Sequence, residues 1–340
     1  MRKFWSPDKW LLYLALALSL VACGGNAKAG TTATTTPDTT NNQPGTGPKG
    51  LPLYCPMSVT VDRQDTIYVS DNDNTTIHER IIKLSPAGQE LGEWHIFPPG
   101  NLGMAQGPGD AAFDMQGNMY VLDLDHDKVV KVSPGGKIIA SWGSSGSGQG
   151  QFQEPQGIAV DSHGNIYVGD NDNSSWRIEE FSNTGKFLNV ATTQGSTASI
   201  SLAVDSSDNL YVASGISITE ISPTGQTIGK LQITGSDSKS SAIWTALSIN
   251  AHGDMYATQL TLANNSQEFY PNILKIDYAT GKTLAAWSVW KAGIKGVLSM
   301  ALDSQGNLYA SELTNAGATQ LQKFSSTGEV LDTWKGTCSS

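Results

Sequence analysis

A 13-residue motif occurs six times along this 340-residue chain, and this repetition constrains the fold more than any other feature. Each copy carries a tyrosine six residues after an aspartate, or after Asn250 in the fifth copy. The tyrosines are separated by 52, 47, 44, 45 and 53 residues: Tyr68, Tyr120, Tyr167, Tyr211, Tyr256 and Tyr309. A period in this range with a constant inner spacing indicates an array of similar structural units.

Each unit is predicted to fold as four antiparallel strands. An apolar first strand ends at the acidic residue, and a four-residue turn leads into the second strand, which holds the tyrosine. Asp at the start of this turn and Gly at its end is typical of tight hairpins. Third strands are predicted at 81–84, 129–132, 177–181, 218–221, 273–276 and 321–324. The fourth strand ends in tryptophan in four copies: Trp94, Trp142, Trp287 and Trp334.

The first strand of every copy has a small residue two positions before the acid and a larger one directly before it. Alternation with a period of two places these side chains on opposite faces of the strand. Neither position is charged, so both faces should be covered, as they are when each sheet lies between two neighbours. The sequence therefore predicts an all-β, six-bladed β-propeller of four-stranded antiparallel blades. A seven-bladed ring of the WD type would need one more copy than the chain contains.

The chain resembles NHL repeats. The likeness is strongest in the third copy, where Trp142-Gly143 is followed by SSGSGQGQFQEPQGIAVD, then GNIYVGD and RIEEFSNTG. It extends from about Pro56 to Trp334. It is weakest in the fifth copy, where Asn250 replaces the aspartate and residues 259–272 are inserted. The resemblance implies a six-bladed ring. It also implies a binding or scaffold role, as in the extracellular sensor portions of bacterial kinases.

The first residues are predicted to be an export signal. Arg2 and Lys3 precede an apolar run at 10–20, which is too short to span a bilayer comfortably. Leu20-Val21-Ala22-Cys23 resembles the lipobox of bacterial lipoproteins, so Cys23 is the expected lipidation site, holding the protein at the membrane of the cell envelope. The predicted division of the chain is a signal at 1–22, a disordered Thr/Gly/Pro-rich tether at 23–50 and the propeller at 51–340.

Two cysteines remain, one near each end of the predicted propeller. A closed ring brings its first and last blades together although Cys55 and Cys338 are 283 residues apart in sequence. In an oxidising compartment we expect these two residues to form a disulfide.

The charge balance excludes a general nucleic-acid partner. The chain has 21 basic and 31 acidic residues; without residues 1–22 it has 18 and 30, a net charge of −12. Nucleic-acid binding depends on Lys and Arg neutralising phosphates, and an acidic surface repels them.

Three loops that follow second strands are acidic, and they should lie on one sector of one face of the ring. Clusters of carboxylates suit Ca²⁺ or another divalent cation, although the same Asp and Asn residues cap loops in many NHL repeats. No cofactor is required by the sequence. The candidate ligands are Asp71, Asp73, Asp123, Asp125, His126, Asp127, Asp170 and Asp172.

The sequence favours two classes of function, and a role in envelope architecture without a specific ligand also remains open. The first is a non-enzymatic module that binds an extracellular protein, peptide or glycan through loops on a rigid ring. The second is a metal-assisted lyase or lactonase that uses the acidic loops. Zinc chemistry would need converging histidines, and His163 and His252 occupy turn positions expected on the opposite face, where they are read as surface residues. The tryptophans are expected to pack between blades.

Overall fold

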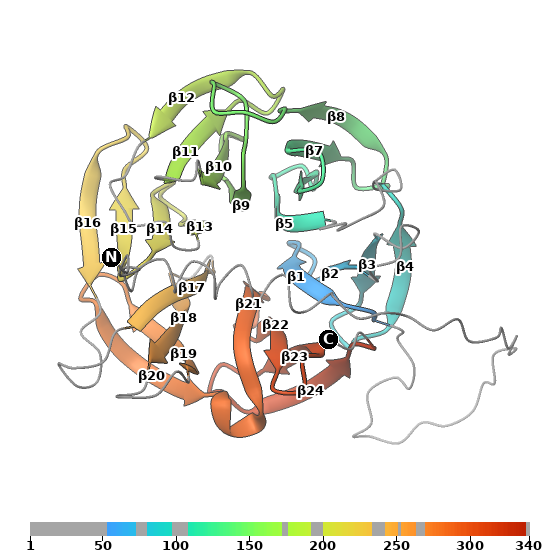
Figure 1. Ribbon diagram of the computed structural model, residues 1–340, viewed down its shortest axis with the longest axis vertical. Helices are drawn as coiled ribbons and strands as arrows, with labels where there is room; N and C mark the ends of the chain where they lie inside the picture. Colours follow the sequence, from blue (N-terminus) through green and yellow to red (C-terminus); the bar gives the residue numbers. More distant parts are fainter. Residues whose placement is uncertain are drawn as a thin grey trace, which may run out of the picture.

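The computed structural model describes residues 53–72, 80–96, 108–171, 176–191, 200–232, 242–250, 253–262 and 269–337. These residues form six four-stranded antiparallel sheets and one short 3-10 helix at Trp290–Ala292. Figure 1 shows the sheets as six blades around a central axis, with the last blade beside the first. The predicted six-bladed β-propeller is confirmed.

The strands of each blade follow one another in sequence. Blade 1 comprises β1 (Pro56–Val61), β2 (Ile67–Asp71), β3 (Arg80–Leu84) and β4 (Glu90–Trp94). Blade 2 comprises β5 (Pro108–Phe113), β6 (Met119–Asp123), β7 (Lys128–Val132) and β8 (Ile138–Trp142). Blade 3 comprises β9 (Pro155–Val160), β10 (Ile166–Asn171), β11 (Trp176–Phe181) and β12 (Phe187–Ala191). Blade 4 comprises β13 (Ile200–Val204), β14 (Leu210–Ser214), β15 (Ser217–Ile221) and β16 (Thr227–Gln232). Blade 5 comprises β17 (Ala242–Ile249), β18 (Met255–Leu262), β19 (Phe269–Asp277) and β20 (Lys282–Ser288). Blade 6 comprises β21 (Ile294–Leu302), β22 (Leu308–Thr314), β23 (Thr319–Phe324) and β24 (Val330–Lys335).

Blade 5 differs from the sequence prediction. The stretch 259–272 is not simply an insertion outside the sheet, because β18 continues to Leu262 and β19 begins at Phe269. Their ladder runs from Met255–Ile276 to Leu262–Phe269. Much of the added sequence therefore lengthens the hairpin of the blade.

The spacing between the acidic residue and the tyrosine has a direct structural reason. Asp114 accepts the backbone N–H groups of Gln116 (3.0 Å) and Asn118 (2.8 Å) through Oδ1, and the hydroxyl of Tyr120 (3.1 Å) through Oδ2. One carboxylate thus closes the turn and satisfies the phenol of the next strand. The tyrosine hydroxyl donates to the turn aspartate in all blades except the fifth: Tyr68, Tyr120, Tyr167, Tyr211 and Tyr309.

In blade 5 the turn keeps its geometry although its acid has moved. The Asn250 side-chain oxygen accepts the N–H of Asp254 (2.9 Å), and the Asn250 amide donates to the Asp254 carboxylate (3.3 Å). Lys275 lies 2.8 Å from that carboxylate. The other blades place the acid at the first of these two positions, so blade 5 has exchanged Asp and Asn across its turn.

The third residue after the acid adopts a left-handed conformation. Glycine fills it in four blades, but in blades 1 and 4 it is Asp65 (φ 60°) and Asp208 (φ 61°). Both carboxylates bind the turn of the preceding blade: Asp65 accepts the N–H (2.7 Å) and hydroxyl (2.6 Å) of Ser304, and Asp208 accepts the same groups of Ser162. These contacts offset the strain of a non-glycine residue at positive φ.

We therefore expect Ser304→Ala to weaken the junction between blades 6 and 1. Loss of the hydroxyl bond to Asp65 should lower the free energy of unfolding by about 1 kcal/mol, measured by urea denaturation. Ser206→Ala is the matched control, because Ser206 holds the same turn position in blade 4, and the residue of blade 5 at the position of Asp65 is Gly253. Equal losses in the two variants would contradict this role for Ser304.

The tryptophans pack between blades, as predicted. Four fourth strands carry a tryptophan, and each indole has an atom 2.0 to 2.6 Å from the position that an alanine Cβ would take at a glycine in the next blade. The pairs are Trp94 with Gly136, Trp142 with Gly185, Trp287 with Gly328 and, across the closure of the ring, Trp334 with Gly88. Each of these glycines has a φ between 75° and 85°. Only glycine allows both the conformation and the close approach.

The ring closes without exchange of a described strand, because every blade is one continuous stretch of sequence. Leu53 forms an isolated parallel bridge with Gly336, and the Thr337 N–H donates to the carbonyl of Tyr54 (2.9 Å). The Ser299 hydroxyl also accepts the Val59 N–H (3.3 Å). Both ends of the described chain therefore lie at this junction.

Two predictions about the chain ends concern undescribed residues. Cys55 is fully buried at the junction, and its expected partner Cys338, one residue beyond Thr337, lies outside the described residues. Cys23 and the segments 1–22 and 23–50 also lie outside them. No helix in the described part of the chain is long and apolar enough to cross a membrane.

Candidate functional site

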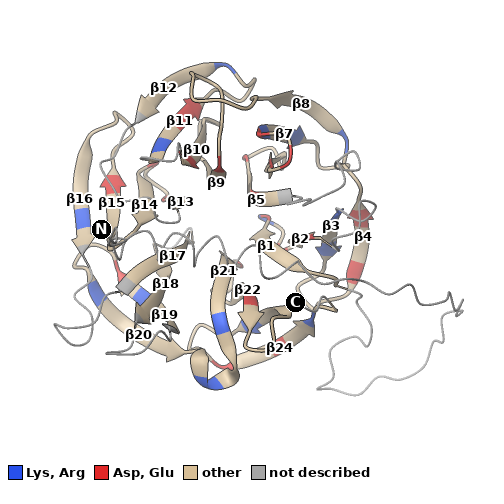
Figure 2. Cartoon of the chain, in the orientation of Figure 1, with Lys and Arg blue, Asp and Glu red and all other residues tan. Residues whose placement is uncertain are grey.

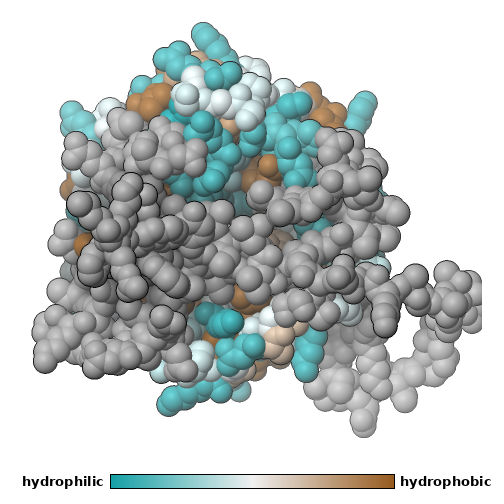
Figure 3. All heavy atoms as spheres, viewed as in Figure 1, coloured by the Kyte–Doolittle hydropathy of each residue, from teal (hydrophilic) through white to brown (hydrophobic). Residues whose placement is uncertain are grey.

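The mouth face is defined here as the face that carries the loops between second and third strands. Figure 2 shows acidic residues between β6 and β7 and at β10, with basic residues of β7 and β11 beside them. In the space-filling view the described residues are largely hydrophilic (Figure 3). Ile216, in the turn between β14 and β15, is an exposed aliphatic residue of this face. Six other exposed aliphatic residues lie on the outermost strands, one at the same position of each blade: Leu91, Ile139, Leu188, Ile228, Leu284 and Leu331.

Asp71 holds the beginning of blade 1. Its carboxylate has no exposed surface and accepts the backbone N–H of Tyr54 (2.9 Å to Oδ1). Arg80 donates to Oδ2 from Nε (3.2 Å) and Nη2 (3.0 Å), and its Nη1 contacts Glu93 (2.7 Å). Burial raises the pKa of Asp71, and the bonds from Tyr54 and Arg80 act in the opposite direction.

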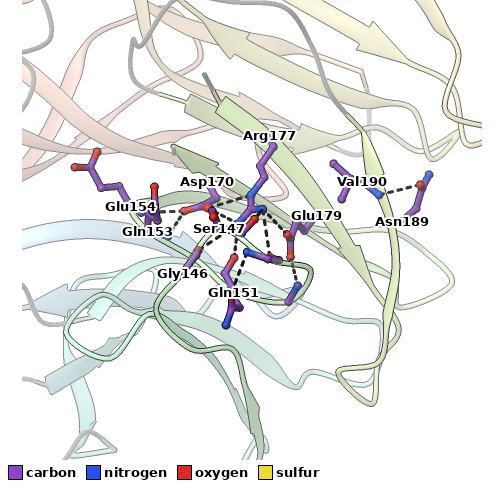
Figure 4. Close-up of polar contacts among 12 residues, drawn as sticks. Gly146, Ser147, Gln151, Gln153, Glu154, Asp170, Arg177, Glu179, Asn189 and Val190 are labelled. Carbon is purple, nitrogen blue, oxygen red and sulfur yellow. Dashed lines mark hydrogen bonds and ion pairs between the residues drawn. The ribbon is translucent and has the colours of Figure 1, made fainter. Parts of the chain in front are cut away.

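Asp170 has the equivalent role in blade 3, shown in Figure 4. Its Oδ1 accepts the N–H groups of Gln153 (2.8 Å) and Glu154 (2.9 Å). Arg177 donates to Oδ2 from Nε (3.2 Å) and Nη2 (3.0 Å), the same two atoms and distances as in blade 1. Asp170 also has no exposed surface.

Arg177 additionally organises the loop between blades 2 and 3. It donates to the carbonyls of Ser147 (2.6 Å), Gly148 (3.2 Å) and Gln151, and its Nη1 lies 3.3 Å from Glu179. Glu179 is buried and accepts the N–H of Gly150 (2.8 Å). Burial raises the pKa of Glu179, and Arg177 opposes this change. The glycine-rich loop is therefore fixed by one guanidinium and two carboxylates.

Blade 2 has an Asp–His contact instead of an Asp–Arg pair. Asp123 is 7% exposed and accepts the backbone N–H of His126 (3.2 Å), and its oxygens lie 2.9 and 3.0 Å from His126 Nδ1. The imidazole is 36% exposed. Asp127 adopts a left-handed φ of 52°, and burial raises its pKa, to which Asp170 and Asp123 add.

Six of the eight candidate ligands lie in described residues: Asp71, Asp123, Asp125, His126, Asp127 and Asp170. Asp73 and Asp172 lie outside the described residues. Among the described residues, no three His, Cys, Asp or Glu side chains form a group that could hold a metal ion. Asp71 and Asp170 cap loops, as the resemblance to NHL repeats suggests. His163 is 75% exposed on the opposite face, as expected, and contacts Asp208; His252 is not described.

Sequence reasoning missed Glu312, although the repeats offered a signal for it. It stands nine residues after its turn acid, as do Asp71, Asp123 and Asp170, but it is a glutamate in β22, and the loop after this strand has no acids. It has no exposed surface, and its Oε2 accepts only the Gln320 amide (3.0 Å). Its Oε1 is buried without a hydrogen-bond partner. Burial raises the pKa of Glu312 from 4.5 to about 7, and the Gln320 bond opposes this only in part.

This buried carboxyl should make stability depend on pH. Between pH 4.5 and about 7 the folded protein keeps a proton on Glu312 that the unfolded chain has lost, so stability falls as pH rises through this range. Glu312→Gln should remove this loss and be more stable than the parent at pH 8 by up to about 3 kcal/mol. At pH 4 the two should be equal in urea denaturation. Exposed Glu329→Gln is the control, and a Glu312→Gln variant no more stable at pH 8 would refute the assignment.

A second missed acid lies in the inner strand of blade 2. Asp110 accepts the Ser58 hydroxyl of blade 1 (3.1 Å) and the Ile158 N–H of blade 3 (3.4 Å). Burial raises its pKa to about 6. The equivalent position in blade 4 is Ser201, which accepts the Leu247 N–H of blade 5 (3.0 Å). These side chains join neighbouring blades close to the axis.

Comparisons with known proteins agree with this architecture. Residues 152–175, in blade 3, match the NHL repeat family. The structure is similar to virginiamycin B lyase from Staphylococcus aureus, with a TM-score of 0.55, 14% identity and coverage of 82% of this chain and 84% of that one. A protein of unknown function from Bacteroides caccae gives a TM-score of 0.52 at 14% identity, covering 77% and 91%. The WD40 repeats of RRP9 give 0.50 at 12% identity, covering 83% and 81%. Together these findings establish a six-bladed β-propeller with an NHL repeat in its third blade.

Proposed function

We propose that this protein is a non-catalytic binding module that is lipid-anchored through Cys23 to a bacterial cell envelope. Its mouth face presents loops to an extracellular protein, peptide or glycan. One observation supports this above the others: the buried carboxylates of blades 1 and 3 accept hydrogen bonds from the backbone of this chain. Asp71 accepts the N–H of Tyr54, and Asp170 accepts the N–H of Gln153. Such a mouth offers a rigid, shaped surface.

Site-specific photo-crosslinking in intact cells tests the binding face. A photoreactive residue at Lys128, at the mouth end of β7, should give a discrete adduct. The same residue at Lys137, in the exposed turn on the opposite face, should give none. Adducts from Lys137 alone would contradict the proposal. Cys23→Ser should move the protein out of the membrane fraction if Cys23 carries the lipid.

The proposed Cys55–Cys338 disulfide would lock the junction between blades 6 and 1. The bridge between Leu53 and Gly336 supports it, because these residues lie two positions before each cysteine. Peptide mapping without reduction should recover the two cysteines in one linked pair. Free thiols at both positions in protein taken from the envelope would exclude it.

A metal-assisted lyase or lactonase is the second candidate, favoured by the contact of Asp123 with His126. A carboxylate that accepts the Nδ1 proton leaves the lone pair on Nε2, which could bind a metal or accept a proton. Calorimetry with Ca²⁺, Mg²⁺ and Zn²⁺ tests this candidate. Binding that is lost in Asp125→Ala and His126→Ala would support it, and the absence of heat above buffer would exclude it.

A further inference from the structure

One position of the blade repeat works as a seat for a guanidinium group. This position is an acid nine residues after the turn aspartate, near the end of the second strand. The first residues of the third strand lie directly across the sheet from this acid. In blades 1 and 3 the cross-strand partner is arginine: Asp71 with Arg80 and Asp170 with Arg177. Both arginines use Nε and Nη2 on one carboxylate oxygen, and both side chains retain about a tenth of their exposure. A guanidinium at this position therefore reaches the surface while it neutralises a fully buried acid.

Blade 6 keeps the acid but replaces the arginine. Glu312 pairs across the sheet with Gln320, in the register of the two Asp–Arg pairs. Gln320 is neutral, occupies only Oε2, and is itself 8% exposed. Among the described residues Glu312 has no ion pair, whereas Asp71, Asp123 and Asp170 each contact a basic side chain of their own blade. An unpaired buried carboxylate is costly for folding.

In the part of the chain that the structure describes, no other charge in the surrounding strands compensates Glu312. In β1 there is no charged residue, and Lys295 of β21 and Lys335 of β24 are exposed. Lys323 of β23 lies over the Tyr309 ring and 3.8 Å from Asp303, at the opposite end of the blade. The blade thus retains an acid that weakens it, a pattern typical of functional positions.

We propose that Glu312 is the binding seat for the guanidinium group of an arginine side chain carried by a peptide or protein ligand. The ligand's guanidinium would take the place that Arg80 and Arg177 hold in blades 1 and 3, with Gln320 turning aside. Two N–H donors on one carboxylate give a charge-assisted contact that a simple ammonium does not reproduce. This inference deepens the proposed binding function and rests on it for the nature of the ligand.

The seat can be tested with agmatine as a free guanidinium probe on the full chain. Agmatine should bind at pH 8, detected by calorimetry and by a rise in Tm. N-(4-aminobutyl)urea, which keeps the ammonium group of agmatine but has a neutral urea in place of the guanidinium, should not bind. Because a bound cation favours ionised Glu312, affinity should fall by roughly tenfold for each pH unit below the pKa of this group. Glu312→Gln should weaken binding at least tenfold, and Glu329→Gln should leave it unchanged.

A second variant supplies the missing arginine. Gln320→Arg should occupy the seat from within, abolish agmatine binding and raise Tm at pH 8. The proposal is overturned if agmatine does not bind the parent protein, or if Glu312→Gln binds it equally. If agmatine does not bind while the crosslink at Lys128 is still formed, the proposed binding function is retained and only the guanidinium assignment is rejected. Near-UV circular dichroism of Glu312→Gln verifies that lost binding does not reflect lost packing.

Discussion

Gly328→Ala should lower the free energy of unfolding by about 3 kcal/mol or more, because it violates two requirements at once. Gly328 has a φ of 85°, where an L side chain is strained. Its Cβ would also lie 2.0 Å from Nε1 of Trp287 in the preceding blade. The indole sits on the junction between blades 5 and 6 and stacks on Tyr256 at 5.6 Å, so it cannot yield without disturbing that junction.

The chain supplies a matched control for this effect. Gly225 occupies the equivalent turn of blade 4 with a φ of 80°, but nothing lies within 4 Å of its would-be Cβ. Gly225→Ala should therefore show the backbone strain alone, about 1–2 kcal/mol. The difference between the variants in urea denaturation measures the contact between blades. Equal losses would mean that the tryptophan does not define the packing at this junction.

Arg177→Gln should destabilise the protein by about 3–5 kcal/mol, the usual result of removing one partner from a buried ion pair. Asp170 and Glu179 would both remain buried without their cation, and the carbonyls of the 146–151 loop would lose their donor. The loop should also lose hydrogen-exchange protection, since Gly150 is tied to Glu179 within the same network.

Adding Asp170→Asn should restore part of the stability, because the double variant no longer buries that unpaired charge. Arg63→Gln is the control for loss of a positive charge, since Arg63 is exposed on a turn, and its effect should stay within about 0.5 kcal/mol. If Arg177→Gln were as mild as Arg63→Gln, the loop would not depend on this arginine.

The architecture was predictable because the interactions that build a blade are local. The turn carboxylate binds groups two, four and six residues later, so Asp114, Asn118 and Tyr120 carry their structure as a spacing. The role of the tryptophans followed from their regular position at strand ends. Blade 5 was less predictable, because it departs from the repeat of the other blades. It exchanges Asp and Asn at Asn250 and Asp254, and its hairpin is extended.

The sequence by itself determined the number of blades, their four-stranded plan and the closing of the chain ends, since local turns and a constant period suffice for these. It could not determine the role of each acid on the mouth face, because the hydrogen-bond and ion-pair partners of each carboxylate come from other segments of the chain. Asp71 and Tyr54 are 17 residues apart in sequence. Asp170 is bound by the N–H groups of Gln153 and Glu154 and by Arg177, whereas Glu312 accepts the amide of Gln320 across the sheet. All three acids are fully buried in the folded ring, and the partner across the sheet separates them: Asp71 and Asp170 each pair with an arginine, whereas Glu312 contacts the neutral Gln320.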